Sequence, residues 1–153
     1  MRLVSALFLV AGSILAIGAA HASGISTDMP GVRNSGQAHI DYILKCQGCH
    51  RPDGGGDSFS NPPMGGVVAR FLSVSGGREY LGRVPGVATT DLDNARLADL
   101  LNWTLYRFDR ANLPVDFKPY DASEIGRLRQ SPLRIEASAT RARLIAKMPG
   151  GTL

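Results

Sequence analysis

The stretch Tyr42-Ile43-Leu44-Lys45-Cys46-Gln47-Gly48-Cys49-His50 (YILKCQGCH) contains both cysteines of the chain and one of its three histidines. A disulfide between Cys46 and Cys49 would close a very short loop, which removes little chain entropy from the unfolded state. A structural disulfide therefore explains this pair poorly. The residue after the second cysteine is a histidine, so the stretch has the pattern Cys-x-x-Cys-His.

Two other uses of a Cys-x-x-Cys pair have weak support. A structural zinc ion needs four protein ligands, and the remaining histidines, His21 and His39, do not form a second ligand pair. Thioredoxin-like exchange places the motif after a strand. Here Ala38, Tyr42 and Cys46 recur every fourth residue, which is typical of a helix.

A covalently bound haem accounts for every defined position of the motif. Cys46 and Cys49 would each bond one vinyl group on one edge of the porphyrin, and His50 would bring its imidazole to the iron. A redox dithiol, or a chance Cys-x-x-Cys-His, is the alternative. The motif therefore predicts one haem c per chain.

The first 22 residues have the pattern of a secretory signal peptide. Arg2 precedes an apolar run over residues 3–19, and Ala20-His21-Ala22 then resembles a cleavage site. A retained membrane anchor is the alternative, although the run is only near the lower limit for spanning a bilayer, about 17–25 residues. Cleavage after Ala22 predicts an exported, periplasmic protein, and export argues against a nucleic-acid partner.

A long helix is expected over residues 90–108, capped by Thr90 or Asp91. Its apolar side chains recur at helical spacing and would form a single stripe: Leu97, Leu100, Leu101, Leu105 and Phe108. Two shorter helices are expected before it, at residues 67–72 and 79–81, separated by Gly76-Gly77.

The chain resembles the monohaem, class I-like c-type cytochromes from about residue 36 to residue 108. In that family a first helix precedes the attachment site, and a last helix crosses the first through aromatic side chains. Trp103, Tyr106 and Phe108 supply aromatics here, with Tyr42 as their expected partner. The resemblance implies a mostly α fold, a small helical domain around one covalent haem.

Residues 23–35 are expected to be flexible, residues 36–113 to form the haem domain, and residues 114–153 to be a basic extension. From Arg127 onward there are six Lys and Arg residues and a single carboxylate, Glu136. A helix over residues 135–147 would turn Ile135, Ala139, Ala142 and Ile145 inward. We expect it to dock weakly or fray. A docking arm for an acidic redox partner or anionic lipid is the sharper alternative, with membrane contact at most peripheral.

Electron carriers of this family usually bind the iron with a methionine shortly before the last helix. The corresponding stretch here, residues 83–90, contains no methionine. Met64 is the candidate, because Pro62-Pro63 and Gly65-Gly66 surround it in an irregular segment. Met29, Met148, or an iron open to water or another ligand are the alternatives. Met64 could instead simply pack the haem edge.

One of three arginines, Arg70, Arg78 and Arg83, could bind a haem propionate. For any single one of them, a solvated surface arginine is the favoured alternative. The glycine-rich segment 52–57 lacks a P-loop lysine and is expected to be a tight turn.

The resemblance implies one-electron transfer between a periplasmic dehydrogenase and an oxidase or other acceptor. No nucleophile–base arrangement can be assembled from the sequence, so an electron carrier rather than an enzyme is expected. One alternative is a haem-based ligand binder or small peroxidase-like enzyme with an open distal site. Another is the cytochrome subunit of a dehydrogenase complex.

Overall fold

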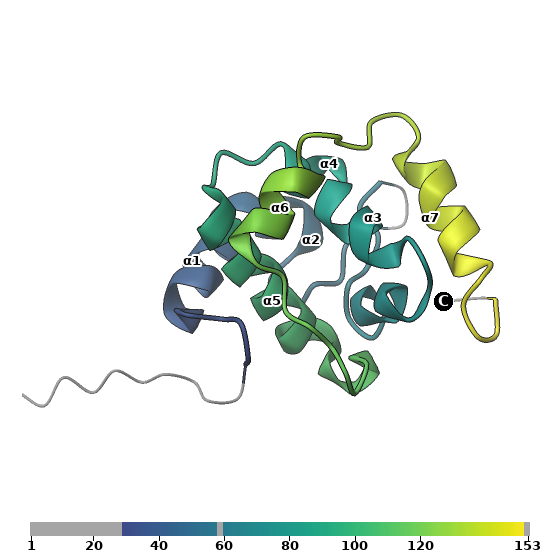
Figure 1. The fold of residues 1–153 in the computed structure, drawn as a ribbon, viewed down its shortest axis with the longest axis horizontal. Coiled ribbons are helices and arrows are strands. Elements are labelled where there is room, and N and C mark those ends of the chain that lie inside the picture. The colour runs from purple at the N-terminus through teal and green to yellow at the C-terminus, as the bar shows by residue number, and fades with distance from the viewer. Residues whose placement is uncertain (1–28, 58–59, 152–153) are drawn as a thin grey trace, which may run out of the picture.

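The computed structural model describes residues 29–57 and 60–151, and over that part of the chain it contains helices and loops but no strands (Figure 1). The mostly α fold expected from the sequence is confirmed. The elements in chain order are α1 (Ser35–Lys45), α2 (Gln47–His50), the 3₁₀ helix η1 (Val68–Ser73), α3 (Gly77–Arg83), α4 (Pro85–Ala88), α5 (Asn94–Asp109), the 3₁₀ helix η2 (Arg110–Asn112), α6 (Ala122–Leu128) and α7 (Ala137–Ile145).

Helix α1 forms where the sequence predicts the first helix. The Asn34 side chain caps it by accepting a 2.9 Å hydrogen bond from the Gln37 amide. Ala38 and Tyr42, one turn apart, are both buried. The fourfold spacing that leads into Cys46 therefore marks the face of α1 that enters the core.

Helix α5 begins later than expected. Its cap is Asp93, whose carboxylate accepts hydrogen bonds from the amides of Ala95 and Arg96, each 2.9 Å long. The expectation of a cap at Thr90 or Asp91 is wrong. The Asp91 carboxylate pairs with the ammonium group of Lys45 at 2.8 Å, which leaves Asp93 as the first carboxylate able to cap the helix.

Helices α1 and α5 pack together through aromatic rings. The Tyr42 ring lies 5.4 Å from Trp103 and 5.1 Å from Phe108, centroid to centroid. Tyr106 instead contacts Phe117 beyond α5, at 5.9 Å. The predicted aromatic partnership between the first and last helices of the haem domain is confirmed for Trp103 and Phe108.

The short helices between them form a tight corner. The 3₁₀ helix η1 and helix α3 confirm the two short helices expected around Gly76-Gly77. A Cβ atom on Gly77 would lie 1.8 Å from the Phe71 carbonyl oxygen, so only glycine allows this approach. The Phe71 and Tyr80 rings then stack at 5.0 Å.

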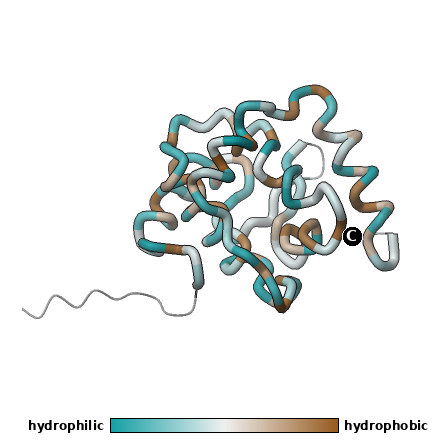
Figure 2. Tube along the Cα trace, in the orientation of Figure 1, coloured by the Kyte–Doolittle hydropathy of each residue, from teal (hydrophilic) through white to brown (hydrophobic). Residues whose placement is uncertain are grey.

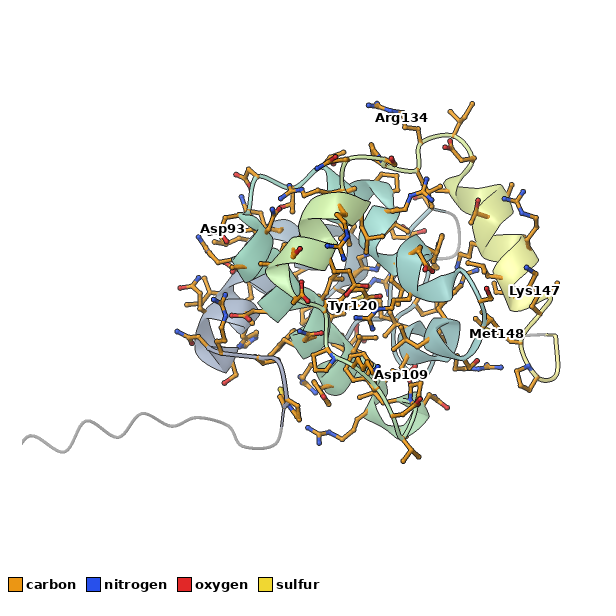
Figure 3. The ribbon with its side chains drawn as sticks, in the orientation of Figure 1. Asp93, Asp109, Tyr120, Arg134, Lys147 and Met148 are labelled. Atoms are coloured by element: carbon orange, nitrogen blue, oxygen red, sulfur yellow. The ribbon has the colours of Figure 1, made fainter. Side chains whose placement is uncertain are left out.

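The C-terminal extension, residues 114–153, contributes buried side chains to the core. Residues 97–105 of α5 are all buried, so this helix needs cover on more than the side facing α1. Helix α6 packs against α5 and supplies Ile125, which is 0% exposed. Tyr120 is also buried, in the middle of the molecule (Figure 3).

Helix α7 lies at one edge of the molecule and packs on α3 (Figure 1). Figure 2 shows that it carries both hydrophobic and hydrophilic positions. The prediction of which residues of this helix face inward is wrong: Ile135 is 98% exposed, whereas Leu144 is 5% exposed. The helix begins at Ala137, so Ile135 lies outside it. Met148, an alternative iron ligand, follows α7 in the chain and is buried.

The described part of the N-terminal segment expected to be flexible is packed. Val32 is buried, and the Arg33 guanidinium pairs with the Asp99 carboxylate at 3.1 Å. Residues 1–28, including the expected signal peptide, lie outside the described residues. Among the helices of the described chain, none has the length and apolar character needed to cross a membrane.

Candidate functional site

One helical turn contains the whole Cys-x-x-Cys-His motif. The Cys46 amide donates to the Tyr42 carbonyl at 2.9 Å, so α1 continues almost directly into the motif. The Cys49 and His50 amides both donate to the Cys46 carbonyl, at 3.1 and 2.9 Å. Both thiols are free, with Cys46 partly buried and Cys49 exposed. A compact turn with two available thiols is suited to bonding one edge of a porphyrin.

The thiol chemistry of this turn differs from that of a redox dithiol. Burial, followed by the charges of Asp41 and Cys49, raises the pKa of Cys46 to about 11. Reactive dithiols instead depend on a thiol whose pKa is lowered. The motif also follows helix α1 rather than a strand. Both observations disfavour thioredoxin-like exchange.

The His50 imidazole is prepared to act as a neutral ligand. Burial lowers its pKa, although the Pro62 carbonyl and the Asp57 carboxylate raise it in part. Its Nδ1 atom is buried and has no hydrogen-bond partner in the described part of the chain. A buried polar atom without a partner is costly, and a metal-bound histidine must be neutral. The residues of this turn therefore fit a haem iron.

The segment after the motif is the tight turn expected from its glycines. Gly54 and Gly56 adopt φ values of 73° and 63°. A Cβ atom on Gly54 would lie 2.7 Å from the Phe108 ring, and one on Gly56 would lie 2.0 Å from the Asn61 carbonyl oxygen. The backbone therefore passes against α5 and then against the segment that leads to Pro62.

Met64 lies on that same returning segment. Its amide donates to the Gly54 carbonyl at 2.8 Å, and its side chain is partly buried against the core. Pro62, two residues earlier, has its carbonyl facing the His50 imidazole. The backbone at Met64 is thus anchored beside the turn that follows His50. Coordination of the iron by the Met64 sulfur stays a prediction.

Two of the three arginines proposed for a haem propionate bind the C-terminal extension. The Arg78 guanidinium pairs with Glu124 at 2.6 Å and donates to the Lys118 carbonyl at 2.6 Å. Arg83 donates to the Ser131 carbonyl, also at 2.6 Å. These contacts explain why the extension is fixed to α3, and they give both arginines a structural role.

Sequence reasoning missed two contributors to the site. The Pro62 carbonyl faces the imidazole, and the Tyr42 hydroxyl holds the Arg51 carbonyl at 2.5 Å. Pro62 had a signal in the sequence, because Pro62-Pro63 stiffens the chain soon after the motif. The Tyr42 contact had none, since a buried tyrosine on a helix does not indicate which carbonyl its hydroxyl will meet.

The first helix of this domain leads into a Cys-x-x-Cys-His turn and packs against a later helix through aromatic side chains. This is the architecture of a c-type cytochrome. Two curated relatives agree, both described as Cytochrome c-552, one from Thermus thermophilus and one from a particular strain of the same species. Each is 32% identical over 107 residues, covering 58% of this chain and 82% and 72% of the relatives. No family model matches the chain.

The chain belongs to the monohaem c-type cytochromes, a family of electron carriers. Its cofactor is haem c, and the two cysteines fit a single attachment site.

Proposed function

We propose that this protein carries single electrons in the periplasm, with its haem bonded to Cys46 and Cys49 and its iron bound by His50. The observation that carries the proposal is one helical turn that holds two free thiols and, directly after the second, the half-buried imidazole of His50. A bound haem supplies an iron that alternates between the ferric and ferrous states.

The protein's own residues would hold and shield this group. Cys46 and Cys49 would hold the haem through thioether bonds, so that it could not dissociate between electron transfers. Burial keeps His50 neutral, and the Pro62 carbonyl is positioned to orient its ring. Because hydrogen bonds and burial around a haem set its potential, these contacts would tune the iron toward its partners.

The experiment is a redox titration of the full-length protein, produced in bacterial cells that attach haem. We expect covalent haem and a reversible one-electron step. His50→Ala should keep the covalent haem but lose the wild-type spectrum and lower the potential. His39→Ala is the matched control, because His39 is exposed on α1 and stacks on Trp103 at 5.3 Å. Absence of covalent haem in the wild type would refute the proposal.

Export and partners are part of the same proposal. Residues 1–22 would be removed as a signal peptide, so N-terminal sequencing of the mature protein should begin at Ser23. The partners would be a periplasmic dehydrogenase as donor and an oxidase or another acceptor. Gel filtration of cell extract separates a free carrier from a subunit of a dehydrogenase complex, since only the subunit would elute with the larger enzyme.

A haem-based ligand binder is the second candidate. It is favoured by the anchoring of the Met64 backbone beside the His50 turn and by the lack of methionine over residues 83–90. Carbon monoxide added to the reduced protein decides between the two. If Met64 is the sixth ligand, the wild-type spectrum stays unchanged and Met64→Ala shifts. If the site is open, both proteins shift alike.

A further inference from the structure

One guanidinium group from the C-terminal extension holds the loop between α4 and α5. Arg129, directly after α6, donates to the carbonyl of Ala88 at 3.3 Å and to the carbonyl of Leu92 at 2.7 Å. It also donates to the Thr90 carbonyl and, at 3.1 Å, to the Asn94 side-chain oxygen. Four oxygens spread over residues 88–94 thus meet a single side chain.

This arrangement fixes the loop in one conformation. The guanidinium has five donors in a rigid plane, so alternate carbonyls can bind it only when the loop curves around it. Arg129 is itself positioned by its amide, which donates to the Ile125 carbonyl at 3.1 Å, and Ile125 is fully buried. A Cβ atom on Gly126 would lie 2.7 Å from the side-chain nitrogen of Asn94, so α6 comes close to the loop.

The same loop is also joined, through a surface ion pair, to the end of α1 that leads into the haem-attachment turn. Asp91 lies between two of the residues whose carbonyls Arg129 binds, and its carboxylate pairs with Lys45 at 2.8 Å. Lys45 is the residue directly before Cys46. The loop is therefore held between the extension on one side and the attachment segment on the other.

We propose that Arg129 is a positioning residue for the haem: through the α4–α5 loop, the C-terminal extension holds a cover against the attachment turn and limits solvent access to the bound group. The extension then has a function in the haem domain that a separate tail would not have. Solvent exposure of a haem lowers its reduction potential. Loss of the Arg129 hydrogen bonds to the loop should therefore lower the reduction potential of the iron. This redox readout depends on the proposed electron-carrier function.

The test compares Arg129→Ala and Arg129→Lys with Arg134→Ala in the full-length haem protein. Arg134 is the matched control, an exposed arginine of the same extension that lies at the edge of the molecule (Figure 3). Amide hydrogen exchange over residues 86–94 and the reduction potential are measured in each. Arg129→Ala should raise loop exchange at least tenfold and lower the potential. Arg129→Lys should do both to a smaller extent, and Arg134→Ala should do neither.

Unchanged loop exchange, or faster exchange without a change in potential, would overturn the proposal. If Arg129→Ala fails to fold, Arg129→Lys, which keeps the charge and loses only the planar fork, decides by the same two measurements. A wild-type protein without a reversible one-electron step would instead contradict the proposed function. If the wild type shows a reversible one-electron step and both Arg129 variants leave its potential unchanged, only the proposed role of Arg129 is contradicted.

Discussion

The hydroxyl group of Tyr42 donates a 2.5 Å hydrogen bond to the backbone carbonyl of Arg51, the residue after the proposed iron ligand. Tyr42 is buried in α1, and its ring packs against Trp103 and Phe108 of α5. The crossing of the two helices is thereby linked to the backbone beside His50. Packing in the core therefore helps to position the haem-binding turn.

Arg51 has a strained backbone, and replacing it with glycine should stabilise the protein. Its φ and ψ angles, 60° and 168°, lie in a region that glycine alone adopts readily. Relief of roughly 1–3 kcal/mol of strain, less about 0.5–1 kcal/mol for the added freedom of glycine, predicts a net gain of about 1 kcal/mol. Urea unfolding of Arg51→Gly measures it. Arg51→Ala keeps the Cβ atom and should show no such gain; equal stability of the two variants would contradict the strain.

Loss of the Tyr42 hydroxyl should cost little more than one ordinary hydrogen bond. Tyr42→Phe removes the donor, but the Arg51 carbonyl still accepts from the Gly54 amide at 3.2 Å. The carbonyl is not left unpaired, so we expect a loss of about 1 kcal/mol in the free energy of unfolding. Tyr106→Phe, which keeps the ring contact with Phe117, is the control, and we expect less than about 0.5 kcal/mol there. A loss above about 3 kcal/mol for Tyr42→Phe would mean that the hydroxyl does more than this one bond.

Asn102→Ala should be strongly destabilising. Asn102 is 0% exposed; its side-chain nitrogen donates to the carbonyls of Gly31 and Tyr120 at 3.0 and 2.9 Å, and its oxygen accepts from the Tyr120 amide at 2.8 Å. Truncation leaves these backbone groups unpaired, with an expected cost of about 3 kcal/mol in urea unfolding. Thr104→Val is the control: this buried hydroxyl donates to the Leu100 carbonyl of its own helix, and the cost should stay below about 1 kcal/mol. Equal costs would rule out the bridging role of Asn102.

Periodicity predicted the parts of the fold that local sequence specifies. Helix α1, the apolar stripe of α5 and the haem-attachment turn each depend on residues a few positions apart, so their spacing alone identified them. The start of α5 was wrong because Thr90, Asp91 and Asp93 are all able to cap a helix. Only the fold shows that Lys45 pairs with Asp91 and leaves Asp93 for that task.

The extension was misjudged for a different physical reason. Asp99 and Asn102 break the apolar pattern of α5 and make one side of it look exposed, yet both are buried and bonded to distant residues, Arg33 and Tyr120 among them. Contacts between residues far apart in sequence leave no periodic signal. The same holds for Arg129, because nothing in the sequence distinguishes it from the other arginines of a basic tail.

Stability should fall steeply in alkali, and Tyr120 should cause part of the fall. Burial raises the pKa of Tyr120 well above its ordinary value of 10.0, against the opposing charge of Arg78. Above about pH 10 an unfolded chain loses this proton while the folded chain keeps it, so the folded state binds more protons and stability decreases as pH rises. Tyr120→Phe should therefore lose less stability between pH 9 and pH 11, although it starts lower at pH 7 because its bond to the Arg78 carbonyl is gone. Urea unfolding at each pH gives the stability curve of both proteins. Parallel curves would show that Tyr120 does not titrate on unfolding. Any pH dependence left in the variant belongs to groups such as Tyr42, whose pKa is raised to about 12.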